Sequence, residues 1–397
     1  MTLRRAAIVS FRLGGTDGVS VEAAKWADAM VALGLEVTTV AGEGTADRIV
    51  AGLGAWSDEA PDVKALHDAL DDADVVVAEN ICSLPLNRRA SDAVAAELAG
   101  RPAILHHHDL PWQRPVEGWP GRTWPVPDDP HWLHVTVNDL SRRQLEDRQV
   151  GAVVERNRFS GEGGPGDRDG TRDRLGIGPD ELVVLQPTRA IARKNVPGGL
   201  ALAEAIGASY WLTGQAEEDY APELERLVRT ARVRVLRGPV RDPADAYAAC
   251  DLVVLPSHWE GFGNPSVEGW LHGRLVAVGA YPVADELRAL GFRWLDSGDA
   301  EEARRLLAPG SAAERNDLIA HNRDAARRHL DLAELPERLR LALDSLKARF
   351  SCRGTDRART DASGGAPTAS PAGSAVTSRR SPGGAAPGAA GTGAQDG

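Results

Sequence analysis

The chain has 397 residues, 42% of them apolar and 26% charged, values that suit a globular protein of about two domains with a sizeable core. The 57 acidic residues outnumber the 46 lysines and arginines, and the net charge of −11 disfavours nucleic acid and anionic lipid as partners. Three widely spaced cysteines argue against a disulfide framework and a zinc site and suggest a reducing cytoplasm. Because the sequence has no apolar stretch of about 18 residues, we expect no transmembrane segment.

Strands and helices alternate in the first half of the chain. Ala6 to Phe11 is predicted to be a buried strand, the loop Gly14 to Gly18 follows it, and Ser20 to Leu33 has helical periodicity. Further short apolar runs predict strands at 36–40, 74–78, 103–105 and 135–137. This alternation predicts a parallel sheet covered by helices on both faces.

The same alternation restarts after residues 161–173, a stretch rich in glycine and aspartate that we predict to be a linker or loop. Strands are predicted at 183–186, 210–213, 233–236 and 252–255, with helices at 196–206, 222–231, 243–250 and from 265. We therefore predict an N-terminal Rossmann-like domain over 1–157 and a C-terminal one over 158–334. An amphipathic helix should close the fold over 335–353, and the glycine-, alanine- and serine-rich residues 354–397 should be disordered.

The most informative segment is DLVVLPSHWEGFGNPSVE, from Asp251 to Glu268. A buried strand enters a tight loop that opens a helix, with Asn264 as the predicted N-cap and Pro265 at the first helical position. Free backbone N–H groups at such a helix start favour an anion, and the loop glycines let a ligand approach closely. Glu260 and Glu268 can face one cleft beyond the strand ends, although each glutamate alone could be structural.

Glu260, which begins the string Glu-Gly-Phe-Gly-Asn, is followed after seven intervening residues by Glu268, and this pair resembles the paired-glutamate motif of retaining GT-B glycosyltransferases, particularly glycosyltransferase family four. The resemblance implies a GT-B fold with two Rossmann-like domains facing a central cleft and the helix 335–353 packed back on the first. It also implies transfer of a hexose-type sugar with no metal and no cofactor. Glu260 would contact the donor sugar, Glu268 the ribose, and the backbone of Gly261, Phe262, Gly263 and Asn264 the hydroxyls and phosphate.

A second segment, VVLQPTRAIARK, carries Arg189 and Lys194 after a predicted strand. The resemblance implies that these two cations hold the donor diphosphate, and preorganised cations would stabilise the charge that leaves with it. Arg193 is a third cation nearby without a matching position. A solvated charge cluster is the alternative, and Thr188 and Asn195 stand where the family usually has glycine.

Three weaker features complete the predicted site. The loop Gly14-Gly15 resembles the family's N-terminal glycine loop beside the donor phosphate and the acceptor. His107 or His108 would lie near the donor or acceptor, Asp109 could be a base, an acceptor contact or an ordinary loop residue, and Asn138 would lie at the inter-domain cleft. A metal is disfavoured here, because adjacent histidines on a strand point in opposite directions.

Two further patterns have competing interpretations. Trp112, Trp119, Trp124 and Trp132 could stack on sugars or simply pack a proline-rich loop. The string Asp72-Ala-Asp74 matches a metal-binding pattern of another glycosyltransferase fold, but it precedes a predicted strand, away from the expected cleft, and we interpret it as a chance match.

The sequence therefore predicts a glycosyltransferase that uses a nucleotide diphosphate sugar, UDP- or GDP-linked, and we favour a small-molecule acceptor over a lipid. A dinucleotide-dependent oxidoreductase is the main alternative, although the first loop lacks the G-x-G-x-x-G fingerprint. A non-catalytic GT-B-like partner protein would more naturally have lost Glu260, Arg189 or Lys194. A GT-B epimerase or phosphorylase is the closer alternative, and dependence on an acceptor would distinguish it.

Overall fold

Parallel strands build both halves of the chain, as the alternating pattern predicts. The computed structural model describes residues 3–84, 86–113, 123–161, 163–217, 219–238 and 242–361, with side chains up to Arg349. The first sheet has the strand order β3-β2-β1-β4-β5-β6-β7 and the second β10-β9-β8-β11-β12-β13. The strands of the first sheet are β1 (Arg5–Leu13), β2 (Glu36–Gly44), β3 (Arg48–Ile49), β4 (Val75–Glu79), β5 (Ala103–His107), β6 (Trp132–Thr136) and β7 (Ala152–Val154). Those of the second are β8 (Val183–Gln186), β9 (Ser209–Leu212), β10 (Val235–Arg237), β11 (Leu252–Leu255), β12 (Leu275–Val278) and β13 (Leu295–Asp296).

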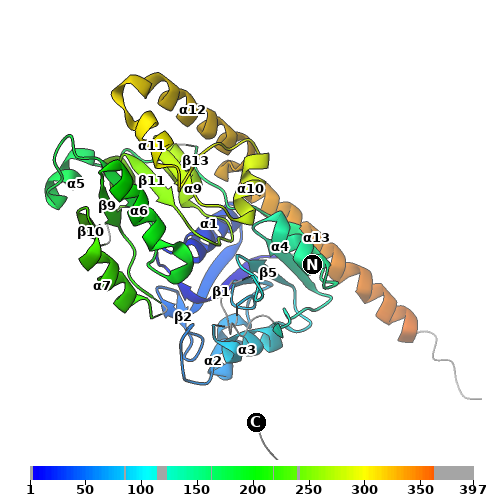
Figure 1. The fold of residues 1–397 in the computed structure, drawn as a ribbon. Coiled ribbons are helices and arrows are strands. Elements are labelled where there is room, and N and C mark those ends of the chain that lie inside the picture. Colours follow the sequence, from blue (N-terminus) through cyan, green and yellow to red (C-terminus); the bar gives the residue numbers. More distant parts are fainter. Residues whose placement is uncertain are drawn as a thin grey trace, which may run out of the picture. The chain divides into compact units, whose positions relative to one another are not determined.

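Helices connect these strands and cover the sheets (Figure 1). Two apolar clusters line the two faces of the first sheet, and a third surrounds the second sheet. These layers give the chain the α/β architecture that the sequence predicts, with two Rossmann-like sheets. The α-helices up to the second sheet's start are α1 (Gly18–Ala32), α2 (Val63–Leu70), α3 (Arg88–Leu98), α4 (Asp139–Glu146) and α5 (Arg168–Leu175). The later ones are α6 (Val196–Ile206), α7 (Ala221–Thr230), α8 (Pro243–Ala249), α9 (Pro265–Leu271), α10 (Pro282–Ala289), α11 (Ala300–Leu307), α12 (Ala312–His329) and α13 (Leu335–Asp361).

The closing helix α13 packs against the first sheet through Leu335, Leu339, Leu343 and Leu346, which share a core cluster with Trp26. Arg349 adds a hydrogen bond from Nη1 to the carbonyl oxygen of Trp132 at 2.7 Å. The helix ends at Asp361, so it continues beyond residue 353, where we predicted its end. Most of the predicted disordered tail, residues 362–397, lies outside the described residues.

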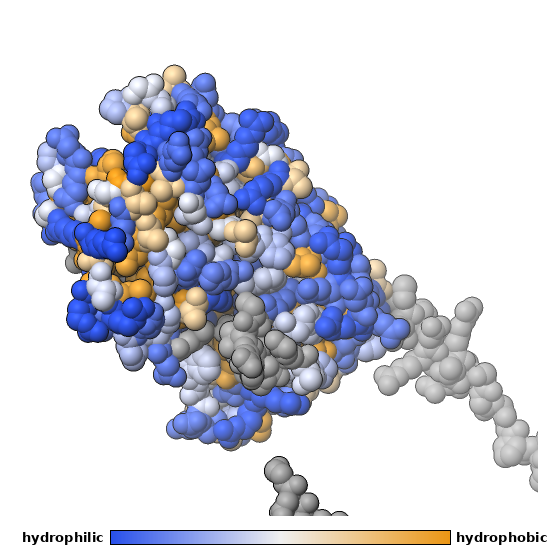
Figure 2. Space-filling view, viewed as in Figure 1, coloured by the Kyte–Doolittle hydropathy of each residue, from blue (hydrophilic) through white to orange (hydrophobic). Residues whose placement is uncertain are grey.

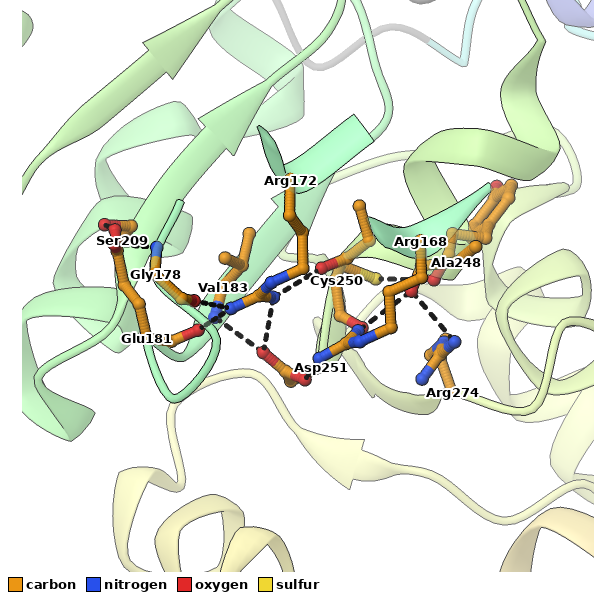
Figure 3. Close-up of polar contacts among 12 residues, drawn as sticks. Arg168, Arg172, Gly178, Glu181, Val183, Ser209, Ala248, Cys250, Asp251 and Arg274 are labelled. Atoms are coloured by element: carbon orange, nitrogen blue, oxygen red, sulfur yellow. Dashed lines mark hydrogen bonds and ion pairs between the residues drawn. The ribbon is translucent and has the colours of Figure 1, made fainter. Parts of the chain in front are cut away.

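The predicted linker 161–173 is partly helical, because α5 begins at Arg168. Figure 3 shows the arginines that fix this helix beside the C-terminal end of α8. Arg172 is 4% exposed and donates to the carbonyl oxygens of Ala249, Gly178 and Glu181 at 2.8, 2.5 and 2.5 Å. Cations that satisfy the last carbonyls of a helix stabilise it, and glycine and aspartate content alone does not show this tertiary contact.

Hydrophilic colours prevail on the face shown in Figure 2, and apolar colours gather where Figure 1 places β9, β10 and α6. Within the described residues, no helix combines the length and the apolar character needed to cross a bilayer.

Asp74, from the string Asp72-Ala-Asp74, accepts hydrogen bonds from the backbone N–H groups of Arg4 and Arg5 at 2.7 and 2.9 Å. It therefore ties down the start of β1, at the sheet edge opposite the strand carboxyl ends.

The strand orders fix where a ligand site can form. In each sheet the order in which successive strands are added reverses once, between the neighbouring strands β1 and β4 in the first sheet and between β8 and β11 in the second. Open parallel sheets bind ligands beyond the carboxyl ends of the strands at such points. The loop with Gly14 follows β1, whereas Arg189 and Lys194 follow β8 and Glu260 follows β11. The predicted site residues thus belong to the connections that this topology favours.

Candidate active site

Glu260 is the centre of a buried charge cluster. It is 4% exposed, and both carboxylate oxygens accept from Lys194 Nζ at 2.6 Å. Ser257 Oγ donates to Oε1 at 2.5 Å, and Arg193 Nη1 donates to Oε2 at 3.2 Å. Burial opposes ionisation, but the charges of Lys194 and Arg193 outweigh it and hold the pKa of Glu260 below its usual value. Burial in turn lowers the pKa of Lys194 to about 8.

The loop after Glu260 contains the glycines that its geometry requires. Gly263 has a φ of +92°, and a Cβ there would lie 2.6 Å from the Tyr281 hydroxyl. Phe262 is buried against Phe159, with ring centroids 6.0 Å apart, so its side chain belongs to the core. Among the described residues, the backbone N–H groups of Phe262, Gly263 and Asn264 donate to no protein acceptor. These groups are available to an anion or a hydroxyl group.

Asn264 occupies the N-cap position of α9 with proline in the first turn, as predicted, but its side chain does not make the expected capping bond. Its φ of −42° and ψ of −44° are helical. Instead, Nδ2 donates to Glu22 Oε1 at 3.2 Å, and Oδ1 accepts from Asn157 Nδ2 at 2.8 Å. Glu22 is 1% exposed and lies 2.6 Å from Lys25 Nζ. The tertiary contact with α1 thus replaces the local cap.

Glu268 lies one turn into α9 and accepts from the Tyr247 hydroxyl at 2.6 Å. The Tyr247 ring stacks on His272 with a centroid distance of 4.6 Å. Burial raises the pKa of Glu268, and the hydrogen bond from Tyr247 opposes that shift. The second motif glutamate is therefore held by α8 rather than by the cations that hold the first.

Arg189 does not join the Lys194 cluster among the described residues. It pairs with Glu217 at 2.6 Å, and Glu217 lies 4.0 Å from Arg12 of β1. Arg12 also lies 3.5 Å from Asp17, which caps α1 by accepting from Ser20 N. Arg12 and Glu217 thus join the glycine loop to the Arg189 segment across the two halves.

The glycine loop depends on a tight backbone contact. Gly14 has a φ of +74°, and a Cβ there would lie 2.6 Å from Thr45 Cβ. At Gly15 the nearest neighbour of a Cβ would be Asp17 Oδ2 at 3.0 Å. Glycine at 14 is therefore required by conformation and by space.

The two halves touch where the segment after β5 meets the Glu260 loop. A Cβ at Gly261 would lie 2.0 Å from the carbonyl oxygen of His108, so the two backbones are in contact. Asn138 Nδ2 donates to the Gly261 carbonyl oxygen at 2.6 Å, and Trp259 Nε1 donates to Asp109 Oδ1 at 3.1 Å. The structure brings His108, Asp109 and Asn138 to the glutamate motif.

Glu286 makes a further contact between the halves that sequence reasoning missed. Its carboxylate accepts the backbone N–H groups of Asp139 and Leu140 at 2.8 and 2.6 Å, at the N-terminus of α4. This position suits a carboxylate, because the first N–H groups of a helix have no intrahelical partner.

The side chains of His106, His107 and His108 point alternately to the two sides of β5, as strand periodicity requires. His107 is fully buried on the other side of β5, where it meets Ser83 Oγ at 2.6 Å and His134 Nδ1 at 3.0 Å. It therefore does not join the motif, contrary to our expectation. His106 and His108 instead share a side and converge on Glu79, so our argument that successive histidines diverge holds only for neighbours.

Glu79 is the main site residue that sequence reasoning missed. It is completely buried. The carboxylate oxygen of Glu79 and the imidazole nitrogens of His106 and His108 that could act as metal ligands lie within 4.8 Å of one another. Both carboxylate oxygens bond directly to imidazole nitrogens. Burial would raise the pKa of Glu79, but the two imidazoles lower it to about 2. In the sequence, this site could have been recognised from Glu79-Asn80, two polar residues directly after the apolar run Val75–Ala78.

The tryptophans mainly pack the surrounding structure. Trp112 Nε1 donates to Gln144 at 2.9 Å, and the Arg148 guanidinium lies 3.6 Å from the Trp112 ring centre. Trp132 Nε1 donates to the Leu98 carbonyl oxygen at 3.1 Å, and Trp124 is 7% exposed. Trp119 lies outside the described residues.

The site-bearing half resembles a known domain family. Residues 199–307 match the family model described as glycosyl transferases group 1. This range includes both motif glutamates and excludes Arg189 and Lys194.

Two curated relatives are similar in sequence. The chain is 24% identical to mannosylglucosylglycerate synthase from Thermotoga maritima over 423 residues, covering 84% of this chain and 98% of that protein. It is 37% identical to D-inositol 3-phosphate glycosyltransferase from Rhodococcus erythropolis over 150 residues, covering 32% of this chain and 31% of that one.

Two solved structures are similar in fold. HepE from Anabaena, in complex with UDP and glucose, has a TM-score of 0.68 and 18% identity, covering 86% of this chain and 100% of that chain. Sucrose-phosphate synthase from Thermosynechococcus elongatus has a TM-score of 0.67 and 14% identity, covering 87% and 99%.

Proposed function

This chain is a glycosyltransferase with a group 1 domain and the GT-B fold, and from this premise we propose a specific reaction. It transfers a hexose-type sugar from a nucleotide diphosphate sugar to a hydroxyl group of an acceptor, with retention of configuration and without a metal ion. The observation that carries the proposal is the contact of Glu260 with Lys194 beside the three free N–H groups of the same loop. A sugar and its leaving phosphate need this combination of carboxylate, cation and amide donors.

The donor would lie along the second sheet. Lys194 and Arg189 would neutralise the diphosphate, the N–H groups from Phe262 to Asn264 would bind phosphate and sugar hydroxyls, and Glu268 would accept from the ribose. Glu260 would contact the donor sugar. As the anomeric bond breaks, negative charge moves onto the diphosphate, so cations already in place lower the barrier.

The acceptor would lie on the first-sheet side, beside Gly14, Gly15, His108, Asp109 and Asn138. Three of these residues contact the motif loop directly. In retaining transfer of this kind, attack comes from the face the diphosphate leaves, and a donor phosphate oxygen takes the acceptor proton. No nucleophilic side chain is then required.

The relatives suggest the substrate class. Mannosylglucosylglycerate synthase and D-inositol 3-phosphate glycosyltransferase carry the names of small hydroxylated anions. We therefore propose a small acceptor rather than a lipid, and a UDP- or GDP-sugar as donor, in line with the UDP–glucose complex of HepE. The cytoplasm is the compartment we propose, because Cys82 and Cys250 are buried free thiols that a reducing environment preserves.

The deciding experiment incubates the purified chain with a panel of UDP- and GDP-hexoses and small acceptors that bear a carboxylate or a phosphate. We expect one donor to be consumed only when an acceptor is present, with an unchanged rate in EDTA and an α-linked product by NMR from an α-linked donor. Consumption without an acceptor would indicate an epimerase or a hydrolase instead. Stabilisation by NAD(P) alone would favour the oxidoreductase alternative.

Glu217 gives a prediction about donor affinity. Its carboxylate pairs with Arg189, which has to meet the donor diphosphate, so the two anions compete. Exposed ion pairs contribute about 0.2–1 kcal/mol. Glu217→Gln should therefore tighten UDP or GDP binding by about two- to fivefold in calorimetric titrations.

Glu223→Gln is the matched control, because Glu223 pairs with Arg226 at the same 2.6 Å within the exposed surface of α7. Its affinity for the nucleotide should equal that of the wild type. Weaker binding by Glu217→Gln would show that Glu217 supports the site instead of competing with the donor.

A further inference from the structure

A buried carboxylate ends a strand at the switch point of the first sheet. Glu79 follows the apolar run Val75–Ala78 of β4, and its exposure is 0%. Burying a charge costs several kcal/mol unless it is paired and hydrogen-bonded. An apolar residue at this position would avoid the cost of burying a charge. The partners of the Glu79 carboxylate therefore indicate what the residue does.

Its two partners differ in one respect. His106 Nδ1 lies 3.0 Å from Glu79 Oε2, its Nε2 is enclosed without a partner, and its ring stacks on Trp26 at 4.1 Å. His108 bonds to Glu79 Oε1 through Nε2. Among the described residues its Nδ1 has no hydrogen-bond partner, yet that atom is not enclosed. Within the described residues, His108 therefore keeps one nitrogen that is neither enclosed nor hydrogen-bonded, whereas the unbonded nitrogen of His106 is enclosed.

The backbone of His108 is fixed on both sides, by Asn80 and by the Glu260 loop. Asn80 has a φ of +59°, an uncommon conformation for a residue other than glycine. This turn directs Asn80 Oδ1 to the backbone N–H groups of His108 and Asp109, at 3.1 and 3.4 Å. The His108 carbonyl oxygen touches Gly261, next to Glu260. Carboxylate, asparagine and histidine thus form one preorganised unit.

We propose that Glu79 is a positioning residue for His108, which it holds with the proton on Nε2 so that Nδ1 faces a hydroxyl group of the bound donor sugar or acceptor. This inference rests on the proposed function. In the neutral ring the Nδ1 lone pair accepts a hydrogen bond from that hydroxyl, and in the imidazolium Nδ1–H donates one. The carboxylate accepts from Nε2–H in both states and keeps its own charge.

The charges around His108 agree with this role. Glu79 of β4, Glu22 of α1 and the neighbouring Asp109 are acidic groups that face it, and His106 lies on its own strand. Burial alone would lower the pKa of His108, but Glu79 above all raises it. Replacing Glu79 with a neutral side chain should therefore move the pKa of His108 to lower pH.

The first test needs no substrate. Nitrogen-15 NMR of histidine-labelled protein distinguishes Nδ1–H from Nε2–H tautomers, and His108→Asn identifies the His108 signals by their loss. We expect His108 to carry its proton on Nε2 when neutral. A proton on Nδ1 would overturn the proposal. This result stands even if no donor in the panel reacts, so it is separable from the proposed function.

The second test compares Glu79→Gln with His106→Gln, which leaves the Glu79 charge in place. Glu79→Gln should lower kcat/KM on the order of 10²-fold, because it removes the carboxylate that fixes the tautomer and the orientation of a substrate-positioning imidazole. Whichever limb of the pH–rate profile belongs to His108 should move to lower pH. His106→Gln should keep the wild-type profile. A selective rise in KM for the donor or for the acceptor identifies the hydroxyl that Nδ1 meets.

Three results would contradict the inference. Equal losses in Glu79→Gln and His106→Gln, with equally lowered Tm and unmoved pH profiles, would mean that Glu79 only packs the strand end. Full activity of a folded Glu79→Gln protein would exclude the role. One equivalent of zinc retained by the wild type but not by Glu79→Gln would make His108 Nε2 a ligand instead of a donor. Calorimetric binding of the nucleotide, which the second sheet governs, should be unchanged in both variants.

Discussion

Lys194→Met is expected to lower kcat by about 10²–10³-fold, as removal of a preorganised electrostatic contact does in other enzymes. Lys194 lies after β8 and donates to both oxygens of Glu260 in the motif loop at 2.6 Å. Methionine keeps most of the side-chain volume and removes only the charge. The measurement is acceptor-dependent turnover at saturating donor, which isolates kcat from binding.

The loss must be separated from unfolding, because among the described residues Glu260 would keep only Arg193 and Ser257 as side-chain partners. Removing one member of a buried pair costs about 3–5 kcal/mol, so thermal unfolding curves have to show that the variant is folded at the assay temperature. Lys64→Met is the control, since Lys64 is 83% exposed and pairs with Asp68 on the surface. A folded Lys194→Met protein with full kcat would remove Lys194 from the proposed mechanism.

The same lysine makes donor binding depend on pH. Burial lowers the pKa of Lys194 to about 8, so the free enzyme loses this cation as the pH rises through about 8. Because the cation favours the diphosphate, affinity for UDP or GDP should be highest below that value and weaken above it. In Lys194→Met this alkaline weakening should disappear.

The strands could be predicted because buried parallel strands consist of continuous apolar runs. VVVA in β4 and LVVL in β11 show this pattern, and the structure places both in the centre of a sheet. The edge strands β3 and β13 have two residues each and carry no comparable run. Their pairing depends on neighbouring strands already in place, which local sequence does not encode.

The family could also be predicted, because the residues that carry the resemblance lie within two short segments. The match to a group 1 domain confirms the resemblance seen at Glu260 and Glu268. Partners distant in the sequence could not be predicted in the same way. Glu22 meets Asn264 across 242 residues and Glu286 meets α4 across 147. Each is a single glutamate with nothing unusual beside it.

Asn264 and His107 show why local rules fail at this site. A local rule places Asn264 correctly at the cap position and predicts a capping bond from its side chain, but that side chain hydrogen-bonds to Glu22 and Asn157 of the other half instead. The histidine run gives no indication of which face of β5 meets the motif, because that depends on how the halves dock. Only the contact of His108 with Gly261 decides it.

Glu268→Gln is expected to weaken UDP or GDP binding by about 10- to 100-fold, the cost of replacing hydrogen bonds to a charged acceptor, at about 1.5–3 kcal/mol. A carboxylate can accept from both ribose hydroxyls, whereas the amide offers one acceptor. Calorimetry measures the loss directly. Affinity equal to that of the wild type would show that the ribose lies elsewhere.

The Tyr247 hydroxyl should tune this binding through pH. Burial raises the pKa of Glu268 and the hydrogen bond from Tyr247 opposes the rise, so Tyr247→Phe should raise that pKa further. Because the ionised form accepts from the ribose, affinity should fall as the pH drops through this raised pKa, and the fall should begin at higher pH in Tyr247→Phe. The terminal phosphate of the nucleotide also titrates near pH 6, at about the value of other phosphate monoesters, and Glu268→Gln reports that contribution alone. Subtracting the Glu268→Gln pH profile from the wild-type profile leaves the contribution of the Glu268 carboxylate. Identical pH profiles for wild type and Tyr247→Phe would mean that the 2.6 Å hydrogen bond does not control the charge of Glu268.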